Sequence, residues 1–413
     1  MSSLVKTPSR VIIITDINYE NFNFKMAKIT KIIILIMVAT FIATPNFVFA
    51  QEDSEQNNYQ EEIFEAKVLE ILEQKETIRE DGSKSILQKL KLKGLEGKWK
   101  DQEIIFDGTE VDVIAKNLYK KGNKVLVSHS QDGDGNDYYY VTDFVRRENL
   151  YFLAVIFVLI ILITGKWRGF RALLGLIFSF FIILKIIIPQ ILNGHNALFI
   201  SLTSALLIIF VSTYLVYGLN KKSTIAILGT FAGIAIVGFF SILFTNLTKL
   251  AGFAEEETIY LVGLTGGNIN LQGLLLAGFI VGALGVLDDI TVSQVSTVQE
   301  IHGTDPSLTR LAIYKKAMRV GVDHIASMVN TLFLAYAGAA LPLLLLFSFK
   351  QPPFLTFSQI INHEIIATEI VRTLVGSIGL ALAVPITTFL AAYFYKNKNL
   401  NGTGMENIKS EQI

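Results

Sequence analysis

Residues 281–303 read VGALGVLDDITVSQVSTVQEIHG, and this stretch decides how the rest of the chain is interpreted. Its first half is apolar and spaced by glycines, as in a tightly packed membrane helix. Two adjacent acids follow, Asp288 and Asp289, and then polar residues on a helical period. A charge inside a bilayer is costly, so these acids mark either a working site or the point where a helix reaches water.

The composition is typical of a membrane protein. Of 413 residues, 51% are hydrophobic and 17% are charged, whereas a soluble domain has about a quarter of its residues charged. The net charge of zero gives no reason to expect a nucleic-acid partner. The absence of cysteine excludes disulfides and thiol chemistry, and no metalloprotease, P-loop or dinucleotide motif occurs. We therefore expect neither an enzyme nor a cofactor.

The N-terminal part has the features of an export signal. Residues 26–50, MAKITKIIILIMVATFIATPNFVFA, place two lysines before a short apolar run and end in Val-Phe-Ala, which predicts a signal peptide cleaved after Ala50. An uncleaved signal anchor is the alternative. Residues 1–25 are foreign to such a signal, so we interpret Met26 as the true start and residues 1–25 as an over-called extension.

A soluble β domain is predicted over residues 51–147. Short runs rich in β-forming residues alternate with turn sequences such as EDGS and YKKGNK. About five strands in this length favour a small OB-like closed barrel, with a small open sheet as the competing fold. Since the signal peptide exports it, the domain is expected outside the cytoplasm. A protein partner is expected to bind it there.

One turn of this domain, QDGDGND at residues 131–137, has acids at spacings similar to a calcium loop, with Asp143 further on. The glycine that such a loop needs at its sixth position is replaced by Asp137, and the final glutamate is missing. A hairpin turn explains the segment fully, and we prefer that interpretation.

Beyond residue 148 the chain predicts an all-α membrane bundle of about seven spans, each about 20 residues long. The linkers alternate between basic ones, such as GKWRGFR and GLNKKST, and ones poor in positive charge, such as LNGHN. The positive-inside rule then places residues 398–413 in the cytoplasm as a polar tail. The expected spans are 149–165, 172–192, 197–217, 224–246, 271–288, 323–348 and 374–395.

Residues 258–270 are too short to cross a bilayer. They form either a re-entrant hairpin broken at Gly266 and Gly267 or a helix at the membrane surface.

Polar residues that belong to the spans or flank them are candidates for a transport path. Glu369 and Arg372, three positions apart, are expected to pair on one helix face, and Lys185 is as consistent with the lipid interface as with a function. After the acids, residues 289–301 are amphipathic, as in an interfacial helix or the lining of a cytoplasmic vestibule. The candidate path consists of Asp288, Asp289, Ser293, Asp323, His324 and Asn330.

Small residues at four-residue spacing predict close helix packing in the later spans. The glycines concerned are Gly229, Gly233, Gly278, Gly282, Gly285, Gly376 and Gly379.

The stretch LLLAGFIVGALGVLDDITVSQVSTVQEIH, together with MRVGVDHIASMVNTLFLAYAGAALPLLLLF and RTLVGSIGLALAVPITTFLAAYF, resembles the YibE/F-like family of bacterial membrane proteins. The resemblance covers residues 148–397 and implies a multi-pass protein of the bacterial plasma membrane, with Asp289 as the better match to the family's acid. It implies no substrate. We expect a permease for an unknown small solute or ion, and the alternative is a scaffold or sensor that couples the external domain to cytoplasmic helices.

Overall fold

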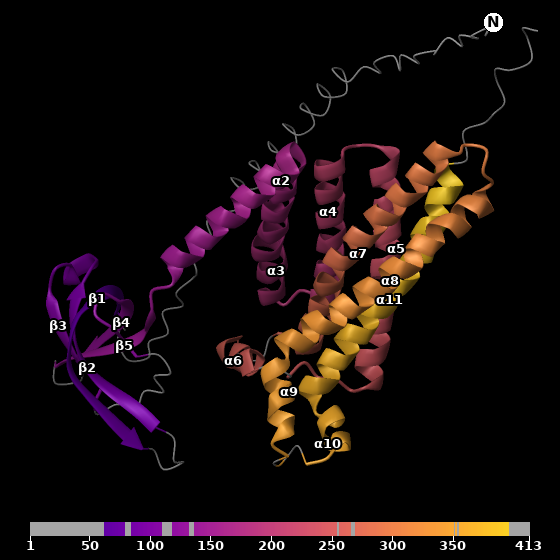
Figure 1. The fold of residues 1–413 in the computed structure, drawn as a ribbon. Helices are drawn as coiled ribbons and strands as arrows, with labels where there is room; N and C mark the ends of the chain where they lie inside the picture. Colours follow the sequence, from indigo (N-terminus) through magenta and orange to yellow (C-terminus); the bar gives the residue numbers. More distant parts are fainter. Residues whose placement is uncertain are drawn as a thin grey trace, which may run out of the picture. The chain divides into compact units, whose positions relative to one another are not determined.

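The computed structural model describes residues 62–78, 84–109, 118–131, 136–253, 256–265, 269–350, 352 and 355–395 (Figure 1). The expected extension 1–25, the signal peptide 26–50 and the tail 398–413 lie outside these residues. The described chain divides into two compact units between Ile163 and Thr164, within the helix α2.

The first unit is a five-stranded antiparallel sheet in the order β3-β2-β1-β4-β5. The long central strand β1 pairs with β2 from Ala66 to Ile78, and register shifts after Val68 and Ile71 curl the sheet into a half-barrel. The edge strands β3 and β5 contact each other, but no hydrogen-bonded ladder joins them in the described residues. The strands are β1 (Glu62–Ile78), β2 (Lys84–Gly94), β3 (Glu103–Asp107), β4 (Lys124–Gln131) and β5 (Asp137–Phe144).

Strict alternation in β2 explains which face of the sheet is buried. Leu90 and Leu92 are fully buried, whereas Lys89 and Lys91 point outward and pair with Asp107 and Glu103 on β3. Lys89 Nζ lies 2.5 Å from Asp107 Oδ2. This bond, together with those from Thr109, lowers the pKa of Asp107 to about 2.

The hairpin interpretation of residues 131–137 is confirmed. Gln131 pairs with Asp137 at the ends of β4 and β5, so these consecutive strands are antiparallel neighbours. Asp132 and Asp134 lie outside the described residues. Asp143 is bound to Arg146 at 2.5 Å, and no acidic or histidine cluster suited to a metal ion occurs in the described part of the chain.

The second unit is helical, and the protein is a membrane protein. Five of its helices are long and apolar enough to cross a bilayer, or six if α8 and α9, which are bent by 67°, make one span. The helical elements are α2 (Arg147–Ile182), the π-helical η2 (Ile183–Ile187), α3 (Ile188–Leu192), α4 (Ala197–Tyr217), α5 (Lys221–Leu247), α6 (Glu256–Thr265), α7 (Leu271–Thr304), α8 (Arg310–Ala339), α9 (Leu341–Ser348), α10 (Phe357–Asn362) and α11 (Glu364–Tyr395).

The difference from the expected seven spans arises at the first two. Residues Arg147–Leu192 count as one apolar stretch of 46 residues, but two helices meet within it at a kink at Lys166. At about 1.5 Å per residue this stretch is about twice as long as a bilayer core is thick. Its backbone leaves the helical region only at Lys166, with φ 47° and ψ −130°, inside the basic linker that the sequence placed between two spans.

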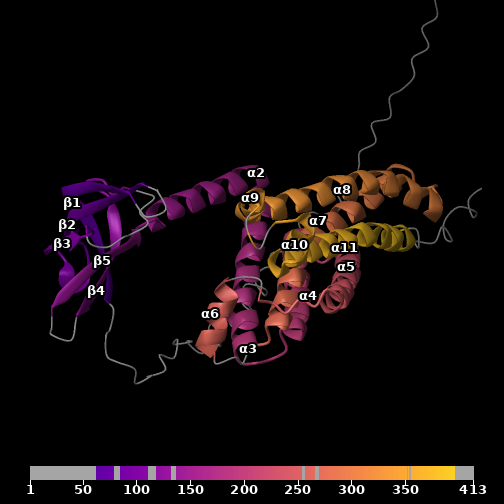
Figure 2. The ribbon, with the colours of Figure 1, turned by 90° about the horizontal axis from the view of Figure 1, so that it is seen from below.

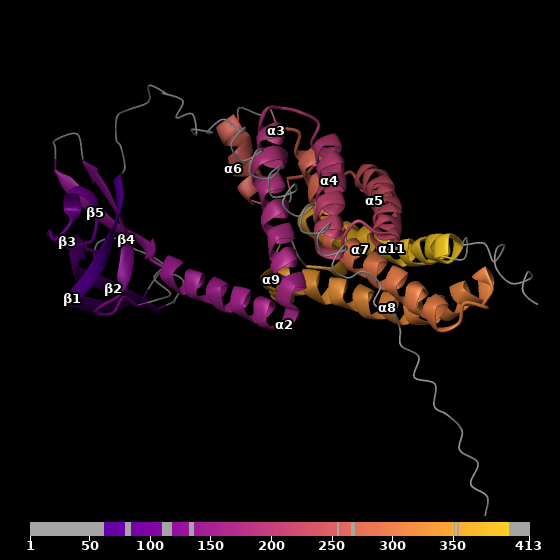
Figure 3. The ribbon, with the colours of Figure 1, turned by 90° about the horizontal axis from the view of Figure 1, so that it is seen from above.

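Helices α5, α7 and α11 form the centre of the bundle, with α4 and α8 packed on α7 (Figures 2 and 3). Glycines bring α5 and α11 together. A Cβ added at Gly229 would lie 2.2 Å from Thr387 Oγ1, and one added at Gly379 would lie 2.2 Å from Val237 Cγ2. Between these contacts, Gly233 faces Ala383, so the two helices pack antiparallel with contacts every four residues.

The other singled-out glycines differ from these. A Cβ at Gly282 would meet the Tyr336 hydroxyl at 3.0 Å, whereas one at Gly278, Gly285 or Gly376 would have nothing described within 4 Å.

Candidate functional site

The two acids lie near the middle of α7, not at a helix end. This helix runs unbroken for 34 residues, from the cap at Asn270 to Thr304. The segment after the acids is buried at Ile290, Thr291 and Val295, where it packs inside the bundle. The expected helix boundary at residue 288 is therefore absent, and residues 289–301 do not lie apart from the bundle as an interfacial helix.

Asp288 points inward. Its side chain is half-buried, and its Oδ1 accepts a hydrogen bond of 3.1 Å from Thr213 Oγ1 of α4. The neighbouring Asp289, about 100° further round the helix, is exposed, and no hydrogen bond or ion pair joins it to any described residue. Only one carboxylate of the pair is therefore directed into the bundle.

A line of polar groups continues from Asp288 through the bundle. Thr291 is one turn further along α7, and its Oγ1 lies 2.6 Å from Thr230 Oγ1 of α5. Gln294 is fully buried and donates through Nε2 to the Ala317 carbonyl at 2.9 Å. We call this set the polar seam: Thr213, Thr230, Asp288, Thr291, Gln294 and Thr387.

Two acceptors of the polar seam are unsatisfied. Gln294 Oε1 and Thr387 Oγ1 are both buried, and neither has a hydrogen-bond partner. A buried polar atom without a partner costs about 1–3 kcal/mol. Both atoms are therefore available to a polar ligand or a water molecule.

A cavity of about 370 Å³ lies beside the first half of α7. Its wall is largely apolar, but it includes the hydroxyls of Ser201 and Thr258 and the guanidinium of Arg372. Ser201 is fully buried and its Oγ has no partner. Gly278 lines the same cavity, which explains the open space at its Cα. The cavity can accept a small, partly polar molecule.

The charge of Arg372 is balanced on its own helix. Its Nη1 lies 2.6 Å from Glu369 Oε1, which confirms the pairing expected from the sequence. The guanidinium also lies 5.5 Å from the centre of the Phe279 ring. The Glu369–Arg372 ion pair therefore gives the cavity wall a fixed dipole but no net charge.

The cavity and the polar seam are separate but share two helices. Along α4, Ser201 and Thr213 are about 18 Å apart, and along α7, Gly278 and Asp288 are about 15 Å apart. The buried residues between them are apolar except Ser204, and they include Ile209 on α4 and Leu284 on α7. An apolar layer therefore divides two polar compartments of one bundle.

The remaining predicted path residues lie elsewhere on α7 and α8. Asp323 and Asn330 are exposed, and Ser293 and His324 are half-buried. No side-chain hydrogen bond or ion pair joins any of these residues to Asp288 or Asp289 in the described chain. Lys185 is exposed within η2.

The seam residues other than Asp288 were not recognised from the sequence. The available signal was weak: Thr230 and Thr387 are hydroxyl residues in apolar helices, next to or opposite a packing glycine.

Comparison with known proteins gives one match. A family model described as YibE/F-like protein matches residues 153–397, which include every helix that contributes to the cavity and the polar seam. No curated protein and no solved structure matches the chain.

Proposed function

The chain belongs to the YibE/F-like family, and from this premise we propose that it is a plasma-membrane permease for a small solute or ion. The main observation in support is the carboxylate of Asp288, which faces the interior of the bundle and is the first group of the polar seam. Charged residues within membrane spans are rare and usually serve a pathway or a relay.

The cavity supports the same function. It places hydroxyls and a guanidinium at one level of α4 and α7, and the seam places a carboxylate and an amide at another. Buried apolar side chains separate the two levels. A solute site and a coupling site divided by a closed apolar layer are the parts that an alternating-access carrier needs.

The proposed topology follows from charge. The basic linkers at Lys166, at Lys221 and at 310–319 lie on the cytoplasmic side, and Arg147–Leu192 crosses twice, which gives about seven spans. The β domain lies outside as an OB-like half-barrel, a reading supported by the strand order and the contact between β3 and β5. A reporter fused near Lys315 that reads as external would refute this topology.

Adjacent acids provide a matched test of the permease. We expect Asp288→Asn to abolish transport and Asp289→Asn to preserve it, because only Asp288 faces the polar seam. The ion and metabolite contents of cells that carry each variant are compared with those of cells that carry the wild type or no protein. Contents in Asp288→Asn cells equal to those in wild-type cells, at equal protein levels, contradict the proposal.

A sensor or scaffold is the second candidate, and the compactness of the β unit favours it. In that case removal of residues 51–147 eliminates every response of the cell, whereas a permease retains part of its transport. If cells with the truncated protein still differ in ion and metabolite contents from cells without the protein, the result supports the permease.

A further inference from the structure

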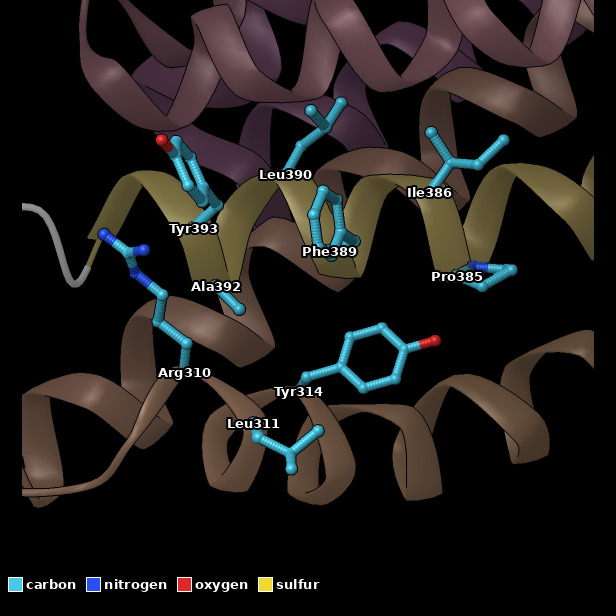
Figure 4. Close-up of a pocket in the computed structure, with 9 residues that line it drawn as sticks. All are labelled: Arg310, Leu311, Tyr314, Pro385, Ile386, Phe389, Leu390, Ala392 and Tyr393. Carbon is cyan, nitrogen blue, oxygen red and sulfur yellow. The ribbon is translucent and has the colours of Figure 1, made fainter.

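Helix α8 lies at the edge of the helical unit, where it packs on α7 and α11 (Figures 2 and 3). Figure 4 shows the N-terminal end of this contact, where Tyr314 lies in the space between α8 and α11 beside an open groove of about 570 Å³. The residues of α8 that are buried against the bundle are Ile313, Ala317, Gly321 and Leu332. One side of α8 therefore faces the bundle from its first turns to its last.

The opposite side of α8 carries polar residues. An α-helix turns by about 100° per residue, so Asn330 lies about 160° around the axis from the buried Leu332. Other residues share the direction of Asn330 at alternating spacings of four and three positions. We call this set the outer face of α8, and all its members are exposed: Asp323, Ser327, Asn330, Leu334 and Ala337.

The polar side chains of the outer face have no partner within the described chain. No hydrogen bond or ion pair joins the carboxylate of Asp323 or the amide of Asn330 to a described residue. The adjacent Thr331 differs, because its hydroxyl donates to the Ser327 carbonyl on the same helix at 2.9 Å. Polar groups of the helix flank are thus satisfied internally, whereas those of the outer face are not.

The depth of Asn330 makes contact with lipid unfavourable. In the topology proposed above, residues 310–319 are cytoplasmic and the span begins near Asp323. Asn330 is seven residues further along α8, which is about 10 Å deeper in the bilayer. An amide that faces hydrocarbon loses its hydrogen bonds to water and gains none in return. The outer face therefore requires a partner that supplies hydrogen bonds.

The spacing of the outer face is typical of a helix that binds another helix. Residues that alternate at three and four positions form the contact line of a left-handed helix pair that crosses at about 20°. Copies of a membrane protein insert in one orientation, so a two-fold axis along the membrane normal brings the same residue of two copies together. Because an asparagine amide both donates and accepts, two Asn330 side chains can satisfy each other across this axis.

The charges at the cytoplasmic end of the outer face are complementary between two copies. Arg319 is exposed one turn before Asp323, and neither residue forms an ion pair within the described chain. In a parallel helix pair, charged residues beside the contact line meet those of the other helix. Arg319 of each copy can therefore offset the carboxylate of Asp323 of the other copy.

We propose that α8 binds α8 of a second copy of this chain through the outer face, as a parallel pair with Asn330 at its centre. The contact extends for about 21 Å, from Asp323 to Ala337, and ends before the 67° bend between α8 and α9. Asp323 and Asn330, which the sequence suggested as path residues, belong to this interface and not to a transport path.

The first test is disulfide cross-linking of the full-length protein in its own membranes. The chain has no cysteine, so each introduced cysteine is the only one. Ser327→Cys and Leu334→Cys lie on the outer face, whereas the controls Ala326→Cys and Phe231→Cys are exposed on another side of α8 and on α5. After oxidation we expect about fivefold more covalent dimer from the outer-face variants, because a disulfide requires Cβ atoms within about 4.5 Å of each other.

A second pair of variants tests the asparagine. Purified proteins with a donor or an acceptor dye on a C-terminal tag are mixed in liposomes, and energy transfer at a series of protein-to-lipid ratios gives the dissociation constant of the dimer. We expect Asn330→Ala to raise this constant by about tenfold, through loss of the hydrogen bonds between the helices. Thr331→Ala should change it by less than about threefold, because that hydroxyl is bound within its own helix. Circular dichroism of each variant verifies that it is folded.

Three results overturn the proposal: equal cross-linking of outer-face and control variants, a monomer at every protein-to-lipid ratio, or an unchanged dissociation constant in Asn330→Ala. A cross-linked product that contains a different protein shows that another occupant covers the outer face, and it refutes the second copy. Neither measurement depends on transport activity.

Discussion

The contact between α5 and α11 makes a quantitative prediction about two glycines of the same helix. Gly376 and Gly379 are both buried, but an added Cβ would have nothing described within 4 Å at Gly376, whereas at Gly379 it would lie 2.2 Å from Val237 Cγ2. Val237 is fully packed and β-branched, so its methyl group cannot rotate away without leaving its preferred rotamer.

The expected effects of alanine have opposite signs. Alanine in a helix interior is about 0.5–1 kcal/mol more favourable than glycine, and Gly376→Ala receives this gain. At Gly379 the same gain is offset by overpacking of about 1–3 kcal/mol. The two variants should therefore differ in unfolding free energy by about 1–3 kcal/mol, with Gly379→Ala the less stable.

The assay is equilibrium unfolding in mixed micelles with an increasing fraction of dodecyl sulfate, followed by helical circular dichroism. Wild type and both variants are measured at one protein concentration. Equal midpoints for Gly376→Ala and Gly379→Ala would show that α5 and α11 do not approach as closely as described, and the reasoning fails.

Two further predictions concern single polar groups. Gln294→Leu removes the hydrogen bond to the Ala317 carbonyl, which is destabilising, and the buried Oε1 that lacks a partner, which is stabilising. Because the two effects offset each other, the unfolding free energy of the variant should stay within about 1 kcal/mol of wild type. A loss above about 3 kcal/mol would contradict the unpaired state of Oε1. In the β unit, the folded pKa of Asp107 is about 2 and lies below its ordinary value of 3.8, so its stabilisation is present above pH 3.8 and is lost as pH falls toward 2. Asp107→Asn should flatten this acid dependence, measured by Trp99 fluorescence in a Trp167→Phe background, and an unchanged acid profile would refute the assignment.

Local patterns predicted the local structure well. The short β-forming runs indicated strands, and in β2 the alternating lysines and leucines lie on opposite faces because side chains of a strand alternate between two sides. The turn chemistry of residues 131–137 likewise predicted the β4–β5 hairpin. The pairing of Glu369 with Arg372 was predictable because residues three apart on a helix are neighbours whatever the helix packs against.

The number of helices was harder to predict, since hydropathy shows where apolar runs stop and not whether the backbone turns. The basic linker at Lys166 interrupts the apolar run, and two helices of α2 meet there at a kink with no loop between them. Hydropathy also suggested that α7 ends at its acids, whereas burial of Thr291 and Val295 shows that the later, more polar half is inside the bundle.

Asp288 and Asp289 were both predicted as candidates, but the sequence could not show which of them faces the bundle. Both acids occupy adjacent positions of one helix, so composition, spacing and cost in a bilayer are the same for both. They differ only in the direction of their side chains, by about 100° around the helix. Asp288 faces α4, where Thr213, which is distant in sequence, donates a hydrogen bond to it. The family resemblance implied Asp289, whereas the contacts favour Asp288 as the functional acid. Because a single turn of α7 carries both, the asparagine variants separate a requirement for a carboxylate at this depth from a requirement for one that faces the polar seam.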